Sequence, residues 1–105
     1  MRNVKEEINE IINDSRVVLF MKGTPFQPAC GFSARVVAVL KANGFAPSTY
    51  RYVNVLEDEL MREEIKSFSQ WPTIPQLYIN GDFIGGSDIV YELHQEGELE
   101  KILKS

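Results

Sequence analysis

The sequence predicts an α/β fold in which helices flank a four-stranded mixed sheet, made of a parallel βαβ unit and an antiparallel hairpin. Two observations lead to this fold class. The apolar run Val17–Met21 is followed by helix-spaced apolar residues at 36–40 and by a β-rich segment at 50–55, the order of a right-handed βαβ unit. Further on, Asn80-Gly81 lies between two strand-like segments and is the strongest two-residue hairpin signal. A chain of 105 residues has room for one domain, 1–105.

The first three predicted helices follow from apolar spacing and end signals. The first has about three turns, carries its apolar face at positions i, i+4, i+7 and i+8, and ends at Asp14-Ser15. The second ends at Asn43-Gly44, a common left-handed stop. The third begins at Asp58, whose carboxylate can cap it, and has one apolar face. The residues of these faces are Val4, Ile8, Ile11 and Ile12, then Val36, Val37 and Leu40, then Leu60, Met61, Ile65 and Phe68.

The segment from Trp71 to Pro75 contains two prolines and is predicted to be non-helical. We expect strands at 76–79 and 83–84, with Gly85-Gly86 ending or bulging the second one. Ser87 and Asp88 are predicted to cap a fourth helix, which Gly97 separates from a last helical turn or two. The element order α-β-α-β-α-β-β-α-α is that of a thioredoxin-like fold.

Composition excludes several classes of function. The net charge of −4 and the absence of a Lys/Arg cluster argue against a nucleic-acid partner. No apolar run approaches the ~18 residues of a membrane span, so we expect no membrane partner. Cys30 is the only cysteine, which forbids an internal disulfide and suits a reducing compartment. We expect the bacterial cytosol, with an organelle matrix as the alternative.

Cys30 is placed where a thiol becomes reactive. It follows the strand and a proline-bearing loop, and it opens the second helix, where unpaired N–H groups and the helix dipole favour a thiolate. The cation of Lys22, at the loop entrance, acts in the same direction. Ser33 stands where a Cys-x-x-Cys enzyme has its second thiol. A disulfide at Cys30 therefore needs an outside thiol to resolve it, and glutathione is the abundant candidate.

Over nearly its whole length the chain resembles the monothiol glutaredoxins of the CGFS type. The matching motifs are Met21-Lys22-Gly23-Thr24-Pro25, Pro28, Cys30-Gly31-Phe32-Ser33, Trp71-Pro72-Thr73-Ile74-Pro75-Gln76 and Gly85-Gly86-Ser87-Asp88. The resemblance implies a glutathione-binding thioredoxin fold with weak oxidoreductase activity. It also implies a [2Fe–2S] cluster shared by a homodimer. One cysteine per chain supplies one of four usual thiolates, so two chains and two glutathiones complete the set.

The resemblance also implies roles for individual residues. Cys30 is the expected catalytic thiol and cluster ligand, and Phe32 lies beside it in the glutathione site. Lys22 and Arg62 would bind the glycyl carboxylate, with Lys66 a weaker candidate. The backbone of Ile74, before a cis Pro75, would pair with the cysteinyl part. Ser87 and Asp88 would bind the γ-glutamyl end, through N–H groups and the Asp88 carboxylate.

Each of these assignments has an ordinary structural alternative. Lys22 and Arg62 are, alternatively, solvated surface charges, Asp88 a plain helix cap, and Phe32 and Trp71 core residues. His94 is expected to be structural or on the surface. Asn54 stands where an aspartate is common in the family, a departure expected to lie away from the site.

Three functions follow from these features. The first is a carrier that transfers an iron–sulfur cluster to apo iron–sulfur proteins. The second is an enzyme that reduces glutathionylated proteins by a monothiol route. The third, which rests on the resemblance alone, is an adaptor that pairs with a BolA-type protein.

Overall fold

The computed structural model describes residues 1–105, and its elements follow the predicted order. The helices are α1 (Val4–Asp14), α2 (Gly31–Ala42), α3 (Glu59–Ser69), α4 (Ser87–Gln95) and α5 (Glu98–Lys104). The strands are β1 (Val17–Met21), β2 (Gly23–Thr24), β3 (Gln27–Pro28), β4 (Arg51–Asn54), β5 (Gln76–Ile79) and β6 (Asp82–Gly85). The small β2–β3 ribbon and two 3₁₀ turns, η1 (Pro47–Thr49) and η2 (Val55–Glu57), were not predicted.

The main sheet has the strand order β4-β1-β5-β6. Strand β1 pairs in parallel with β4, with Leu19 opposite Tyr52, and antiparallel with β5, with Leu19 opposite Leu77. Strand β6 completes the hairpin on the far side of β5. The predicted mixed sheet, a parallel βαβ unit joined to an antiparallel hairpin, is therefore confirmed.

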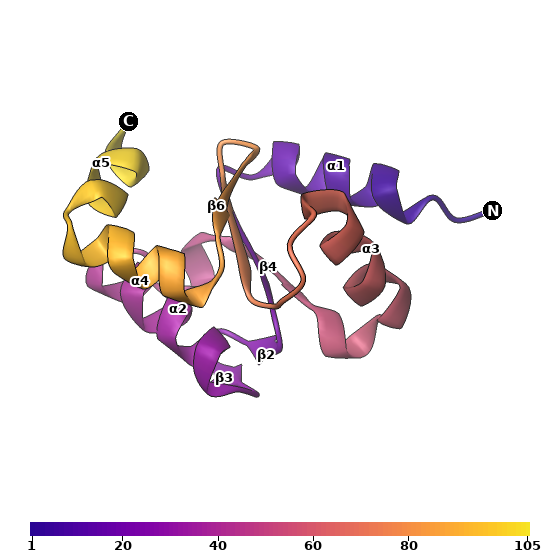
Figure 1. Cartoon of the computed structure of the whole chain (residues 1–105), viewed down its shortest axis with the longest axis horizontal. Coiled ribbons are helices and arrows are strands. Elements are labelled where there is room, and N and C mark those ends of the chain that lie inside the picture. The colour runs from indigo at the N-terminus through magenta and orange to yellow at the C-terminus, as the bar shows by residue number, and fades with distance from the viewer.

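Strand β1 is the centre of the molecule because its side chains enter two cores. Helices α1 and α3 cover one face of the sheet, and α2, α4 and α5 cover the other (Figure 1). Leu19 belongs to the core under α2, α4 and α5, whereas Phe20 belongs to the core under α1 and α3. All five residues of β1 are buried, as expected of a central strand with helices on both faces.

The hairpin forms at the predicted turn. Asn80 and Gly81 have φ angles of 54° and 82°, the left-handed pair that a type I′ turn needs. The register shifts between Leu77 and Tyr78, where Leu77 faces Gly85, so the second arm is bulged at its end. This bulge directs the chain from β6 into α4.

Two predicted helix caps have different outcomes. The Asp58 carboxylate accepts the Met61 N–H at 3.1 Å and caps α3 as predicted. The prediction for α4 is wrong: Gly86 occupies its N-cap position, and no side chain caps it. The side chains of Ser87 and Asp88 instead contact Arg35 of α2, a partner 53 residues away from Asp88. None of the helices has the length and apolar character needed to span a membrane.

Candidate functional site

Cys30 occupies the N-cap position of α2, and its sulfur accepts the N–H hydrogen bond that a side-chain oxygen accepts in most helix caps. Its backbone is extended, and its Sγ accepts the Ser33 N–H at 3.4 Å. The preceding ribbon sets this position, because the Ala29 N–H donates to the Lys22 carbonyl at 2.9 Å. The thiol therefore lies at the positive end of α2, as predicted.

Ser33 is a fully buried partner of this thiol. Its hydroxyl oxygen accepts the Lys22 N–H at 3.1 Å and lies 3.4 Å from the Cys30 Sγ. Because the Lys22 N–H uses an acceptor position on the oxygen, the hydroxyl proton remains available for a thiolate at Cys30. Ser33 therefore does more than replace a second cysteine, because its hydroxyl is oriented to donate a hydrogen bond to the Cys30 thiolate.

The net effect of these surroundings is a lowered pKa of the Cys30 thiol. Burial is the largest single influence and raises the pKa. The Ser33 hydroxyl, the N–H groups of Ser33 and Phe32, and the Lys22 charge together outweigh it. All four favour the thiolate because they stabilise negative charge on sulfur.

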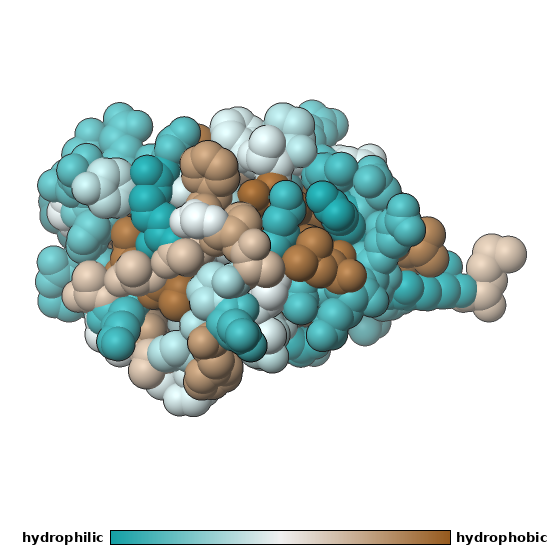
Figure 2. Space-filling view, turned by 90° about the horizontal axis from the view of Figure 1, so that it is seen from below, coloured by the Kyte–Doolittle hydropathy of each residue, from teal (hydrophilic) through white to brown (hydrophobic).

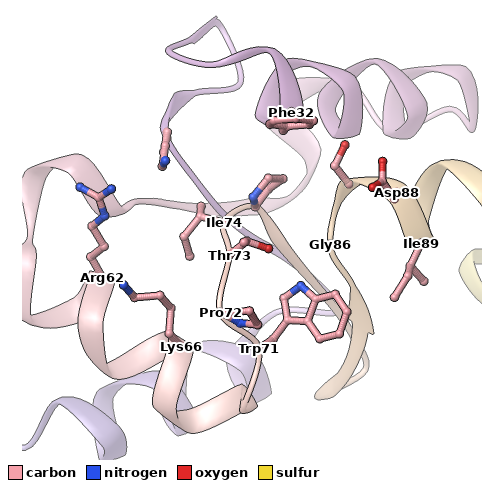
Figure 3. A pocket seen from close by; sticks show the side chains of 13 residues that line it. Phe32, Arg62, Lys66, Trp71, Pro72, Thr73, Ile74, Gly86, Asp88 and Ile89 are labelled. Carbon is pink, nitrogen blue, oxygen red and sulfur yellow. The ribbon is translucent and has the colours of Figure 1, made fainter.

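A groove runs beside Cys30, between the start of α2, α3, the 71–75 loop and the start of α4 (Figure 3). Its charges lie at two ends. Lys22 and Arg62 have no ion-pair partner, whereas Lys66 is paired with Glu63 at 3.2 Å. Arg62 and Lys66 approach from α3, and Asp88 lies at the opposite end near Phe32 (Figure 3). Such a groove suits an extended ligand with an anionic end and a cationic end.

The 71–75 loop forms the floor and is held from below by Gln76. This fully buried side chain donates to the carbonyls of Trp71 and Thr73 at 3.1 and 3.2 Å. The Ile74–Pro75 peptide bond is cis, as predicted. The backbone N–H and C=O of Ile74 make no hydrogen bond within the chain, and the residue lines the groove. They can therefore pair with an extended ligand, as an edge strand does.

The start of α4 closes the other end of the groove. Because no side chain caps this helix, its first N–H groups are left for another acceptor. Ser87 and Asp88 both line the groove there. A carboxylate at this helix end would meet free donors and the favourable end of the helix dipole.

Comparison with known proteins agrees with this geometry. Residues 17–84 match the glutaredoxin family. A relative from Rickettsia conorii, described as a probable monothiol glutaredoxin 2, is 56% identical over 104 residues, covering 99% of this chain and 94% of the relative. The chain belongs to the monothiol glutaredoxins. The solution structure of reduced apo GrxS14 from poplar matches this monothiol glutaredoxin with a TM-score of 0.81 at 46% identity, covering 96% of this chain and 90% of that one.

A more distant structure supports the fold alone. A buckwheat glutaredoxin, solved in complex with glutathione, has a TM-score of 0.82 at 23% identity and covers 96% of this chain and 87% of its own. The shared architecture at such low identity shows that the thioredoxin-like sheet and its helices tolerate wide sequence change.

The structure brings together nearly all the predicted site residues of this glutaredoxin. Lys22, Phe32, Arg62, Ile74, Pro75, Ser87 and Asp88 all line the groove, as does the weaker candidate Lys66. Cys30 is not part of the lining but adjoins it through Phe32 and Lys22. No group of three or more His, Cys, Asp or Glu side chains could hold a metal ion in this chain. The roles of these residues in binding remain predictions.

Three further residues that line the groove or support its walls were not identified from the sequence. Trp71, considered a core residue, lines the groove, and its buried Nε1 has no partner. Asn54 does not line the groove, but it supports the chain next to a residue that does: its Oδ1 accepts the Gly23 N–H at 2.9 Å, beside Lys22. It also accepts the Leu56 N–H at 3.1 Å and so joins the ribbon to η2. Arg35, which holds Ser87 and Asp88, carries no local signal at all.

Proposed function

We propose that this monothiol glutaredoxin binds glutathione in the groove and carries a [2Fe–2S] cluster between two protomers. The observation that carries the proposal is a single cysteine with a lowered thiol pKa, next to a groove with cations at one end and a carboxylate at the other. Glutathione has a complementary charge pattern, with a glycyl carboxylate at one end and an α-amino group at the other.

The charges of the groove favour one direction of a bound glutathione. Its glycyl carboxylate would lie against Lys22 and Arg62, which have no competing ion pairs. Its cysteinyl backbone would pair with the free N–H and C=O of Ile74. The γ-glutamyl carboxylate would meet the uncapped start of α4, and its ammonium group the Asp88 carboxylate. In this direction the glutathione thiol would point toward Cys30, which adjoins the groove through Lys22 and Phe32.

The cluster is the cargo, and one chain supplies one of its four thiolate ligands. Two protomers and two glutathiones would supply all four. Two exposed aromatic side chains, Phe26 at 70% and Phe32 at 63% exposure, flank Cys30 along the chain and give the second protomer an apolar rim. Figure 2 shows the molecule from the side on which β2 and β3 lie. On this face, several groups of hydrophobic side chains are exposed and are separated by hydrophilic ones. A cluster half-held by exchangeable glutathione suits transfer to an apo iron–sulfur protein.

Anaerobic reconstitution with iron, sulfide and glutathione tests this function. We expect the absorption bands of a [2Fe–2S] cluster together with a native mass of two chains, two glutathiones and one cluster. Cys30→Ser should remain a colourless monomer. A wild-type protein that stays colourless and monomeric would overturn the carrier function, as would a Cys30→Ser variant that binds a full cluster.

Substitution of the groove cations tests the glutathione site separately. Arg62→Gln should weaken glutathione binding by roughly ten- to a hundredfold, on the order of the ~1.5–3 kcal/mol of a charge-assisted hydrogen bond. Lys66→Gln should weaken it less, because Lys66 is already paired with Glu63. Titration calorimetry or NMR titration of the reduced protein measures both affinities. Equal effects, or a larger effect at Lys66, would contradict the assignment.

The alternative function is reduction of glutathionylated proteins, and the lowered thiol pKa of Cys30 favours it. The Cys30 thiolate would attack the glutathione sulfur of a protein–glutathione mixed disulfide, releasing the protein thiolate and leaving glutathione on Cys30. A second glutathione thiolate would then attack that disulfide, releasing oxidised glutathione and the Cys30 thiolate. Turnover of a glutathionylated peptide no faster than the uncatalysed exchange would exclude this function.

A further inference from the structure

Arg35 of α2 reaches across to α4 and makes three contacts there. Its Nε donates to the Ser87 Oγ at 2.9 Å, and its Nη2 forms an ion pair with the Asp88 carboxylate. The guanidinium also stacks over the Tyr91 ring, 4.8 Å from its centre. Because all three partners lie in the first turns of α4, the planar group is held at a fixed place beside the start of that helix.

Asp88, in contrast, has no other support. Its side chain is 90% exposed, it does not cap α4, and it forms no hydrogen bond except the one with Arg35. An exposed aspartate without a partner samples several rotamers. Fixing it in one rotamer on ligand binding costs conformational entropy, and this cost lowers the affinity for the ligand. Arg35 is thus the one side chain that sets the direction of this carboxylate.

Arg35 acts from outside the groove. It does not line the cavity, whereas Ser87 and Asp88 do. A carboxylate has two oxygens with about four acceptor positions, and the ion pair with Arg35 uses Oδ1. The second oxygen remains available for a cation inside the groove.

Resting on the glutathione site proposed above, we propose that Arg35 is a positioning residue that orients Ser87 and Asp88 for the α-amino end of the γ-glutamyl group. Its contribution then depends on the ligand. A ligand with a free α-ammonium group benefits from an oriented Asp88, whereas a ligand with that amine blocked does not. Lysine cannot replace Arg35 fully, because a single ammonium lacks the planar fork that reaches Ser87 and Asp88 together.

NMR titration of the reduced, ¹⁵N-labelled protein tests this proposal. The probes are S-methylglutathione, which removes thiol chemistry, and its N-acetyl derivative, which removes the α-ammonium charge. Arg35→Met should weaken binding of S-methylglutathione by about two- to fivefold, the range of a partly exposed charge contact. Arg35→Lys should also weaken it, by a smaller factor. Binding of the N-acetyl ligand should be the same in all three proteins.

The matched control is Arg51→Met, which removes one exposed arginine from β4, away from the groove lining. It should leave both affinities unchanged and so separate net charge from positioning. Tyr91→Leu removes the ring under the guanidinium and should give a weaker loss with the same dependence on the free amine. The amide spectra of the variants report whether the fold is kept.

Two results would overturn the role of Arg35. One is an equal loss for both ligands in Arg35→Met, and the other is unchanged or tighter binding of S-methylglutathione, since tighter binding would make Arg35 a competitor for Asp88. Failure of the wild-type protein to bind S-methylglutathione is a different result, because it overturns the glutathione site itself. The two failures are therefore distinguishable in one set of titrations.

Discussion

Ser33 occupies the position of a second thiol, yet its hydroxyl has a role of its own. It is fully buried, accepts the Lys22 N–H at 3.1 Å and lies 3.4 Å from the Cys30 Sγ. The same side chain thus removes internal disulfide chemistry and supports the thiolate. In a protein with one cysteine, both properties keep Cys30 available to a thiol from outside the chain.

Ser33→Ala should raise the pKa of the Cys30 thiol, because it removes a hydrogen bond that stabilises the thiolate. A lowered pKa enlarges the thiolate fraction at neutral pH, so the variant should have a smaller fraction and react more slowly with iodoacetamide. Alkylation rates as a function of pH measure the shift. Ser67→Ala, at an exposed position in α3, is the control. Superimposable pH profiles for Ser33→Ala and wild type would contradict the role of the hydroxyl.

Gly86 is needed for space. A Cβ at this residue would lie 2.9 Å from the Trp71 Nε1 and 3.4 Å from the Pro75 carbonyl oxygen, both in the floor of the groove. Gly86→Ala should therefore lower the free energy of unfolding by about 1–3 kcal/mol, as overpacking does. Denaturant unfolding measures the change.

Gly31→Ala is the matched control for Gly86→Ala, since a Cβ at Gly31 has no atom within 4 Å. Gly31 is also the first residue of α2, where alanine lowers the entropy of the unfolded chain. Its free energy of unfolding should stay the same or rise by up to about 1 kcal/mol. Similar losses at both glycines would mean that the contact with Trp71 is not the cause.

At the scale of elements, the two helices that border the groove begin differently. Helix α3 is capped by Asp58, which also binds Arg2 near the N-terminus. Helix α4 has no cap, and its first two side chains contact Arg35 instead. The capped helix carries two of the three groove cations, Arg62 and Lys66, and the uncapped helix leaves its first N–H groups without a side-chain acceptor. Helix α3 is thus stabilised at its start by its own cap, whereas the start of α4 has free N–H groups that can bind an anion.

Asp58→Ala should destabilise the protein by about 1 kcal/mol at neutral pH, the usual loss for an N-cap. The hydrogen bonds from Arg2 hold the pKa of Asp58 below its ordinary value, burial opposes them, and the Met61 N–H adds to the lowering. A lowered pKa in the folded state gives stability that is present above the unfolded value of about 3.9 and lost as pH falls through the folded value. The difference between wild type and variant should therefore shrink in acid. Denaturant unfolding at a series of pH values tests this, and a constant difference would contradict it.

At the scale of the whole molecule, β1 joins two cores that share no side chain. Leu19 and Phe20 are adjacent, both fully buried, and point to opposite faces of the sheet. The groove lies at the end of β1, where Lys22 follows the strand. Because both cores pack against β1, both of them help to hold the end of this strand, and with it Lys22, in position beside the groove.

Leu19→Ala and Phe20→Ala should each lower the free energy of unfolding, by about 2–5 and 3–5 kcal/mol respectively. Because one strand serves both cores, each variant should still unfold in a single transition. Circular dichroism follows the helices, and the fluorescence of Trp71 follows the groove. Non-coincident transitions in either variant would show that the two cores unfold separately.

Most of the fold was predictable because its signals are local. Apolar spacing located the helices, the buried run located β1, and Asn80-Gly81 located the hairpin turn, all within a few residues along the chain. The family resemblance likewise assigned Lys22, Arg62, Ile74 and Asp88 to one site, and all four line the groove. The β2–β3 ribbon was missed because strands of two residues carry no periodicity.

The sequence by itself determined that the protein has one thiol, no internal partner for it, and a fold that brings this thiol to a helix start. The tertiary structure alone decided how Asp88 and Asn54 are used. A serine and an aspartate before a helix predict a cap, but Arg35, 52 residues before Ser87 and 53 before Asp88, binds them instead. Asn54 bonds to Gly23, 31 residues away. Competition between a local hydrogen bond and a distant one is settled only when the sheet has brought the distant group into reach.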